Sequence, residues 1–184
     1  MKFISFTHDN TEKFGVIENN LITDLTGKIS GTVNLKELIK ENKINEAKDY
    51  VKSNPGNINP EEIHYLPVIP NPGKIICVGL NYSEHVKETN RTVEENPVIF
   101  HRFPESQTAH LQAIQRPTVS ESLDFEGEMA VVMGEGGKHI KPEDALKNII
   151  GFSCYNESTV REWQRHTRQF GMGKNFEKTG SFGP

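Results

Sequence analysis

Short apolar runs, separated by residues that favour turns, open the chain. The runs KFISFTH, KFGVIEN and NLITDL are divided by turn-forming residues at 8–11 and 19–20. Strands of this length joined by tight turns predict a small antiparallel sheet. The pattern then changes to helical spacing of Leu, Ile, Ala and Val with charged faces in NLKELIKEN and INEAKDYVKS. These stretches predict two amphipathic helices, which end at the breaker segment SNPGNINPEE.

Three prolines in the segment LPVIPNPGK indicate a hinge, and we place a domain boundary near Ile69. Residues 1–69 are therefore expected to form a small N-terminal α+β domain, and residues 70–184 a second domain. The second domain contains one short helical stretch, PEDALKN, and four strand-like runs: KIICVGL, PVIFHRF, EMAVVM and IIGFSCY. The fold class predicted for the chain is therefore α+β and rich in strands.

Composition excludes some partners. The chain has 184 residues with 21 basic and 25 acidic side chains, a net charge of -4, so no overall basic field favours nucleic acid or anionic membrane. The N-terminal stretch MKFISFTHDNTEKF lacks the apolar core of a signal peptide, and no run approaches a membrane span. We therefore expect a cytoplasmic protein.

Cys77 and Cys154 lie in apolar runs without CxxC spacing, which indicates buried thiols.

Glu126 and Glu128 stand where the strand-like run EMAVVM begins, and this pair is the most informative local pattern. Side chains alternate faces along a strand, so two Glu separated by one residue project together. Their repulsion is relieved by protonation, by a nearby cation or by a hard metal ion with a preference for oxygen ligands. Glu157 ends the next strand-like run and can bring a third carboxylate to the same end of the sheet. The alternative is an ordinary solvated strand edge.

His85 and Glu88 follow the strand KIICVGL and are three residues apart, on one face of a helical turn. A His oriented by a carboxylate is a competent general base for activating water, because its pKa lies near neutrality. The alternative is a surface helix with a local ion pair.

Arg161 and Gln164 belong to the stretch NESTVREWQRHTRQF, in which Arg165 and Arg168 continue a helical spacing after a Ser158 or Thr159 cap. Arg offers a planar fork suited to the carboxylate of an anionic substrate. A solvated helix face or a subunit contact is the alternative. Lys174 lies in a Gly-rich loop, where the backbone can approach a ligand closely, although most lysines are solvent-facing. His101, His110, His139 and His166 have no motif spacing and are assigned no role.

Four blocks in this order, KIICVGLNYSEHVKE, LDFEGEMAVVMG, GFSCYNESTVREWQ and GKNFEKTGSFGP, resemble the fumarylacetoacetate hydrolase family from about Lys74 to Pro184. The resemblance implies a domain of rolled mixed sheets, preceded by a small N-terminal domain and usually dimeric. It further implies that Mg²⁺ or Mn²⁺, with Ca²⁺ as a further candidate, is bound by Glu126, Glu128 and Glu157. In the same way His85 and Glu88 activate water, and Arg161, Gln164 and Lys174 face a small anionic substrate.

The resemblance implies hydrolytic cleavage of a C–C bond in a small keto-acid or 1,3-dicarbonyl compound such as an acylpyruvate. Lyase, decarboxylase, hydratase and isomerase chemistry on a related 2-keto acid are alternatives. Two departures stand out: Glu157 occupies a position where most members have Asp, and the chain stops at Pro184. Members of the family continue with further strands, so the sequence predicts a fold that is incomplete at the C-terminus. A further alternative is therefore an inactive fragment that acts only through protein contacts, with a homodimer expected if the full-length fold is present.

Overall fold

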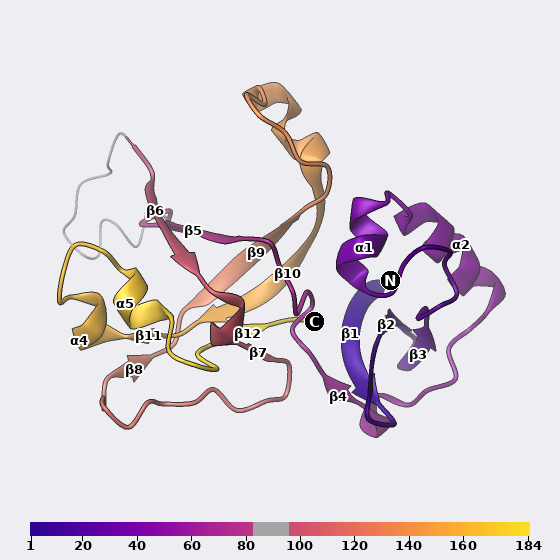
Figure 1. The fold of residues 1–184 in the computed structure, drawn as a ribbon, viewed down its shortest axis with the longest axis horizontal. Helices are drawn as coiled ribbons and strands as arrows, with labels where there is room; N and C mark the ends of the chain where they lie inside the picture. Colours follow the sequence, from indigo (N-terminus) through magenta and orange to yellow (C-terminus); the bar gives the residue numbers. More distant parts are fainter. Residues whose placement is uncertain (83–95) are drawn as a thin grey trace.

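The computed structural model describes residues 1–82 and 96–184. Its N-terminal part is a four-stranded sheet in the order β3-β2-β1-β4 (Figure 1). The strands are β1 Lys2–His8, β2 Thr11–Glu18, β3 Leu21–Asp24 and β4 His64–Tyr65. Both hairpin turns use two residues with positive φ, Asp9 with Asn10 and Asn19 with Asn20. Such turns match the right-handed twist of the strands, so the predicted antiparallel sheet is confirmed.

Two helices, α1 Leu35–Lys40 and α2 Ile44–Ser53, follow the first three strands as predicted, and the single turn η1 Pro60–Glu62 leads into β4. The side chain of Asn34 accepts a hydrogen bond of 2.9 Å from the Glu37 amide and begins α1. The helices bury Leu35 and Leu38 in α1 and Ala47 and Val51 in α2. These side chains pack with the apolar face of the sheet and close the N-terminal core.

The second part is built mainly from strands, as predicted (Figure 1). Its strands are β5 Ile75–Gly79, β6 Val98–Arg102, β7 Gln107–Ala109, β8 Leu123–Asp124, β9 Gly127–Met133, β10 Ile149–Glu157, β11 Thr159–Val160 and β12 Gly180–Phe182. Its short helical segments are η2 Pro104–Ser106, η3 Pro142–Asn148, α4 Arg161–Gln164 and α5 Gly171–Lys174. The central sheet has the order β7-β12-β10-β9 and is mixed, because β12 pairs parallel to β7 and antiparallel to β10. Two-stranded sheets β5-β6 and β11-β8 complete this part.

One hydrophobic core joins the two parts. Tyr155 and Phe182, from β10 and β12, belong to the same buried cluster as Phe14 and Leu38 of the N-terminal part. The hydroxyl of Ser5 also donates a hydrogen bond of 2.9 Å to the carbonyl of Val68. Packing therefore continues across the boundary that the sequence predicts near Ile69.

The outer face of the β9–β10 hairpin carries exposed apolar side chains. Val131 and Phe152 are paired across the hairpin and are 41% and 61% exposed, and Met129 is 61% exposed. Cys154, opposite Met129, lies on this same face and is exposed, so the expectation of a buried thiol is wrong for Cys154. An apolar run identifies a strand, but side chains alternate between the two faces of a strand, so the surrounding structure decides which face is covered.

Within residues 1–82 and 96–184, no helix has the length and apolar character needed to span a membrane.

We expect Leu38→Ala to lower the free energy of unfolding by about 2–5 kcal/mol, because it leaves a cavity in a fully buried site. Leu21→Ala is the matched control, since Leu21 is 43% exposed at the edge of the N-terminal sheet and should cost well under half as much. Urea denaturation followed by circular dichroism measures both. Equal losses in the two variants would contradict this account of the core.

Candidate metal centre

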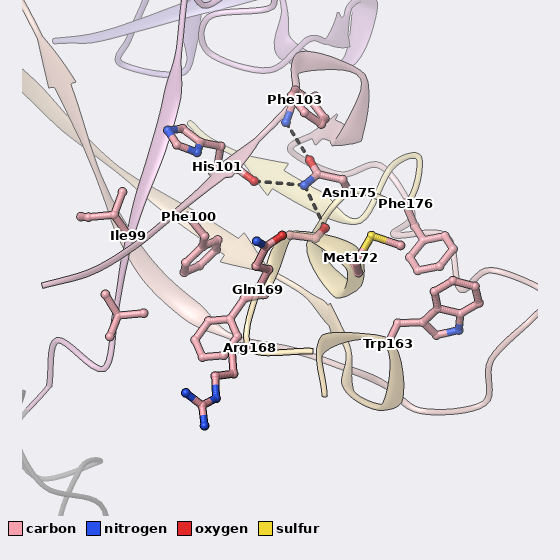
Figure 2. Close-up of a pocket in the computed structure, with 13 residues that line it drawn as sticks. Ile99, Phe100, His101, Phe103, Trp163, Arg168, Gln169, Met172, Asn175 and Phe176 are labelled. Carbon is pink, nitrogen blue, oxygen red and sulfur yellow. Dashed lines mark hydrogen bonds between the residues drawn. The ribbon is translucent and has the colours of Figure 1, made fainter. Parts of the chain in front are cut away.

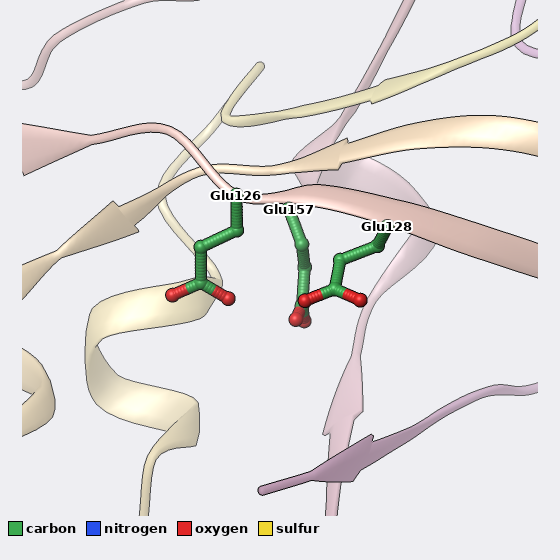
Figure 3. A group of neighbouring side chains, drawn as sticks. All are labelled: Glu126, Glu128 and Glu157. Carbon is green, nitrogen blue, oxygen red and sulfur yellow. The ribbon is translucent and has the colours of Figure 1, made fainter. Parts of the chain in front are cut away.

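Three carboxylates meet where β9 begins and β10 ends. Antiparallel pairing places Tyr155 opposite Glu128, and the Glu157 amide donates a hydrogen bond of 2.8 Å to the Glu126 carbonyl. Oxygen atoms of Glu126, Glu128 and Glu157 all lie within 4.8 Å of one another (Figure 3). The structure therefore brings together the three glutamates that the sequence singled out. Such an all-oxygen group suits a hard divalent cation.

Lys174 lies among these carboxylates and is almost entirely buried. Its Nζ donates to Glu126 Oε2 at 2.8 Å and to Glu157 Oε2 at 3.1 Å, and lies 5.1 Å from the centre of the Phe100 ring. A buried ammonium group is stable only where carboxylates compensate it. Lys174 therefore supplies positive charge at the point where the three carboxylates would otherwise repel one another.

Arg161 closes the other side of Glu126. Its Nη1 donates to Glu126 Oε1 at 2.6 Å and to Gln164 Oε1 at 3.1 Å, while Nη2 pairs with Asp124 at 2.8 Å. Arg161 and Gln164 therefore lie together beside the carboxylates. The Thr159 hydroxyl also donates to Glu126 Oε1 at 2.8 Å. Glu126 is thus held by neighbours at both of its oxygens.

The pKa values of Glu126 and Glu128 are shifted in opposite directions. Burial raises the pKa of Glu126, but the charge and hydrogen bond of Lys174, the Thr159 hydroxyl and the charge of Arg161 outweigh it and bring the pKa below its usual value. Burial also raises the pKa of Glu128, and the charges of Glu126 and Glu157 raise it further, against a hydrogen bond from Tyr82. Of these two carboxylates, Glu128 is therefore the one whose charge is less well compensated.

Glu157 completes the group from the end of β10. One of its oxygens, Oε2, accepts from Lys174, whereas Oε1 is buried without a hydrogen-bond partner among the described residues. The Cys77 thiol lies close by, and its pKa is raised by burial, by the charge of Glu157 and by a weak hydrogen bond to that carboxylate. A thiol is a weak donor, so a buried carboxylate left with little else on one oxygen is costly, and a cation bound among the three glutamates would relieve that cost. The residues present therefore fit a divalent metal ion.

The sequence did not single out two residues that hold this site together. They are Arg102, whose Nη1 lies 3.9 Å from Glu157 Oε1, and Asn175, which follows Lys174 in the sequence. Asn175 Nδ2 donates to the carbonyls of His101 and Gly171 at 3.0 Å each, and its Oδ1 accepts from the Phe103 amide at 2.7 Å. Asn175 thereby fastens α5 to β6 and fixes the backbone on which Lys174 sits. For Arg102 a signal did exist, because an Arg two residues after Phe100 shares the inward face of β6.

A cavity of about 670 Å³ lies beside this centre, between β6 and the segment from Trp163 to Phe176 (Figure 2). Its lining is mainly aliphatic and aromatic, with Arg168 as a basic group, and includes none of the three glutamates. Phe100 lines it and also contacts Lys174, so the cavity adjoins the centre through that ring.

The structure corrects the expected helix around Arg161. Thr159 lies in β11, Val160 occupies the N-cap position, and the helix spans only Arg161–Gln164. Ser158 and Thr159 are therefore not caps, because pairing of β11 with β8 keeps this backbone extended. Arg168 lies beyond the helix and lines the cavity instead of continuing a helical face. His85 and Glu88 lie outside the described residues.

Comparisons with known proteins agree with this geometry. Residues 74–184 match the family model "Fumarylacetoacetate (FAA) hydrolase C-terminal". Over 124 residues the chain is 40% identical to the mitochondrial oxaloacetate tautomerase Fahd2a of Rattus norvegicus, a match that covers 67% of this chain and 40% of that protein. The chain belongs to the fumarylacetoacetate hydrolase family.

Solved structures show the same fold. The fumarylacetoacetate hydrolase EaFAH of Exiguobacterium antarcticum superposes with a TM-score of 0.83 at 30% identity, over 100% of this chain and 65% of that one. Maleylpyruvate hydrolase of Sphingobium sp. SYK-6, solved with manganese(II) and pyruvate, has a TM-score of 0.78 and 19% identity, over 100% and 66%. At that identity the second likeness shows the fold alone. The chain thus spans about two thirds of these structures and 40% of the rat relative.

The opposite electrostatics of Glu126 and Glu128 give a stability prediction. In EDTA at neutral pH, we expect Glu128→Gln to raise the melting temperature and Glu126→Gln to lower it. Glu128 has a raised pKa, so its charge costs stability as pH rises through that pKa, and the gain in Glu128→Gln should widen from acid to neutral pH. Glu126 has a lowered pKa, so its contribution is present at neutral pH and is lost as pH falls through that pKa.

The exposed Glu143 lies on η3, away from the three glutamates, and Glu143→Gln is the control for loss of one negative charge. Thermal melts between acid and neutral pH measure all three variants. A lower melting temperature for Glu128→Gln than for wild type at neutral pH would show that its charge is well compensated.

Proposed function

We propose that this chain carries the metal centre of a divalent-metal-dependent enzyme that interconverts the keto and enol forms of a small 2-keto acid such as oxaloacetate. The observation that carries the proposal is the convergence of three glutamate carboxylates, with oxygens within 4.8 Å of one another and with one carboxylate, Glu157, almost fully buried. The 40% identity with an oxaloacetate tautomerase supports the substrate class. Mg²⁺ or Mn²⁺ suits the donor set, because both prefer oxygen ligands.

Glu126, Glu128 and Glu157 would hold the ion, which when bound would polarise a substrate carbonyl as a Lewis acid. The chain's own cations supply the remaining electrostatics. Lys174 presents a buried ammonium beside the carboxylates and is placed to stabilise the negative oxygen of an enolate. Arg161 is fixed by Asp124 and Glu126 at the same edge and can orient a substrate carboxylate. Burial strengthens the interaction of Lys174 by excluding water.

Hydrolytic cleavage of a C–C bond in an acylpyruvate is the second candidate function. It is favoured by the 30% identity with a fumarylacetoacetate hydrolase that aligns along the whole of this chain. Both reactions pass through an enolate next to a carboxylate, so Lys174 and Arg161 would serve either one. Hydrolysis additionally requires an activated water, for which His85 with Glu88 is the proposed base.

Metal binding is tested by calorimetric titration with Mn²⁺. We expect Glu128→Ala to bind at least about tenfold more weakly than wild type, because one of three carboxylate ligands is lost. Glu143→Ala, at an exposed position on η3, is the control and should bind as wild type does. Equal affinity of Glu128→Ala and wild type would remove Glu128 from the ligand set.

Activity is tested by following the ultraviolet absorbance of enol-oxaloacetate and, separately, release of pyruvate from acylpyruvates, each with Mn²⁺. We expect the tautomer interconversion to be accelerated, and Lys174→Met to reduce that rate about 10²–10³-fold through loss of enolate stabilisation. Pyruvate release that is abolished in His85→Ala would favour the hydrolase instead. Binding of Mn²⁺ without turnover in either assay would favour a non-catalytic role through protein contacts.

A further inference from the structure

Arg102 is a buried charge that the proposed chemistry does not use. Its side chain is wholly buried at the end of β6, and within residues 1–82 and 96–184 it makes three hydrogen bonds, all to neutral oxygens. Nε donates to Ser106 Oγ at 3.3 Å, Nη1 to the Ser158 carbonyl at 3.3 Å and Nη2 to Thr179 Oγ1 at 2.8 Å. Neutral acceptors satisfy the hydrogens of a guanidinium but do not balance its charge, so a buried Arg needs a carboxylate as well.

Glu157 provides that carboxylate. Its Oε1 lies 3.9 Å from Arg102 Nη1 and is the oxygen that has no hydrogen-bond partner among the described residues. The other oxygen, Oε2, accepts from Lys174. Glu157 thus lies between two cations, Lys174 and Arg102. Arg102, the cation next to Oε1, is held by hydrogen bonds to several segments of the chain.

The surrounding structure leaves Arg102 little freedom to move. The three acceptors lie on η2, between β10 and β11, and just before β12, so each comes from a different segment of the chain. The guanidinium also lies 5.9 Å from the centre of the Tyr155 ring. At Gly180 a Cβ would collide with the Tyr155 hydroxyl and lie 2.8 Å from Arg102 Nη2, so no space remains on that side. Arg102 is therefore a fixed positive charge behind Glu157.

We propose that Arg102 is a positioning residue for the metal centre. It holds the Glu157 carboxylate at the end of β10 and offsets the repulsion of three glutamates, so that the centre is organised before an ion enters. The Arg side chain suits this role because its planar fork reaches three acceptors while its charge faces the carboxylate. The inference rests on the proposed metal binding and assigns to Arg102 a share of the ion affinity without direct contact with the ion.

The test compares Mn²⁺ affinity with folding in four variants of the whole chain. Arg102→Gln removes the charge, Arg102→Lys keeps the charge but loses the fork, and Thr179→Val removes one anchor of the guanidinium. Lys13→Met is the charge-matched control, because Lys13 pairs with Asp24 at 3.0 Å in the N-terminal sheet. Calorimetry with Mn²⁺ gives the affinity per folded molecule, and melts in EDTA give the stability of each variant.

We expect Arg102→Gln to bind Mn²⁺ about 10–100-fold more weakly, as removal of residues that orient metal ligands does, and Arg102→Lys to recover part of that loss. Lys13→Met should bind as wild type does, whatever its melting temperature. Wild-type affinity in folded Arg102→Gln would show a merely structural role and overturn the inference. If Arg102→Gln does not fold, Thr179→Val decides: a several-fold loss supports the inference, and wild-type affinity overturns it. Failure of the wild type itself to bind Mn²⁺ overturns the proposed metal centre.

Discussion

Repulsion among three glutamates at one end of the β9–β10 hairpin is the constraint around which the second part of the chain is organised. Glu126, Glu128 and Glu157 approach within 4.8 Å of one another in a site that excludes much of the solvent. Burial lowers the effective dielectric and strengthens that repulsion. A fold can keep such a group only if positive charge is built around it or bound within it.

The cations that meet this constraint come from three separate segments. Lys174 on α5 bridges Glu126 and Glu157, Arg161 on α4 pairs with Glu126, and Arg102 on β6 faces Glu157. Burial and the charges of Glu126 and Glu157 raise the pKa of Glu128, which receives less compensation than Glu126. The protein's own cations are thus distributed unevenly: Lys174 and Arg161 hold Glu126, Lys174 and Arg102 face Glu157, and Glu128 has no salt bridge to a described residue.

The neutral groups of the site place these cations. Asn175 ties α5 to the strand that carries Arg102, and Thr179 receives one hydrogen bond from Arg102 just before β12. The strand β12 then pairs with the end of β10, next to Glu157. Displacement of any one of these segments would move a charge relative to the carboxylates. The irregular segments around the sheet therefore have a definite role, which is to hold charges that the strands alone cannot supply.

The sequence by itself determined the elements with strong local patterns. Strands β1, β2, β9 and β10 and helices α1 and α2 follow from apolar spacing and turn residues, and the spacing of Glu126 and Glu128 placed their side chains together. These features depend on neighbours within a few residues, so a local pattern records them. The helix observed after Glu157 spans only Arg161–Gln164 and is shorter than the sequence predicts. It begins later because Thr159 and Val160 pair with β8 and stay extended. Cys154 was misjudged because only the tertiary structure decides which face of a strand is covered.

Tertiary structure alone decided which charges meet. Arg102 reaches acceptors 56 and 77 positions away in the chain, and Lys174 lies 48 positions from Glu126. The resemblance to a family pointed to Lys174, but nothing in the local sequence showed that it would be buried between two carboxylates. Electrostatic compensation depends on distance in space, and the strand pairings that set those distances are long-range contacts. The carboxylates of this centre could therefore be predicted from the chain, whereas the arrangement of its cations arises only when the sheet is assembled.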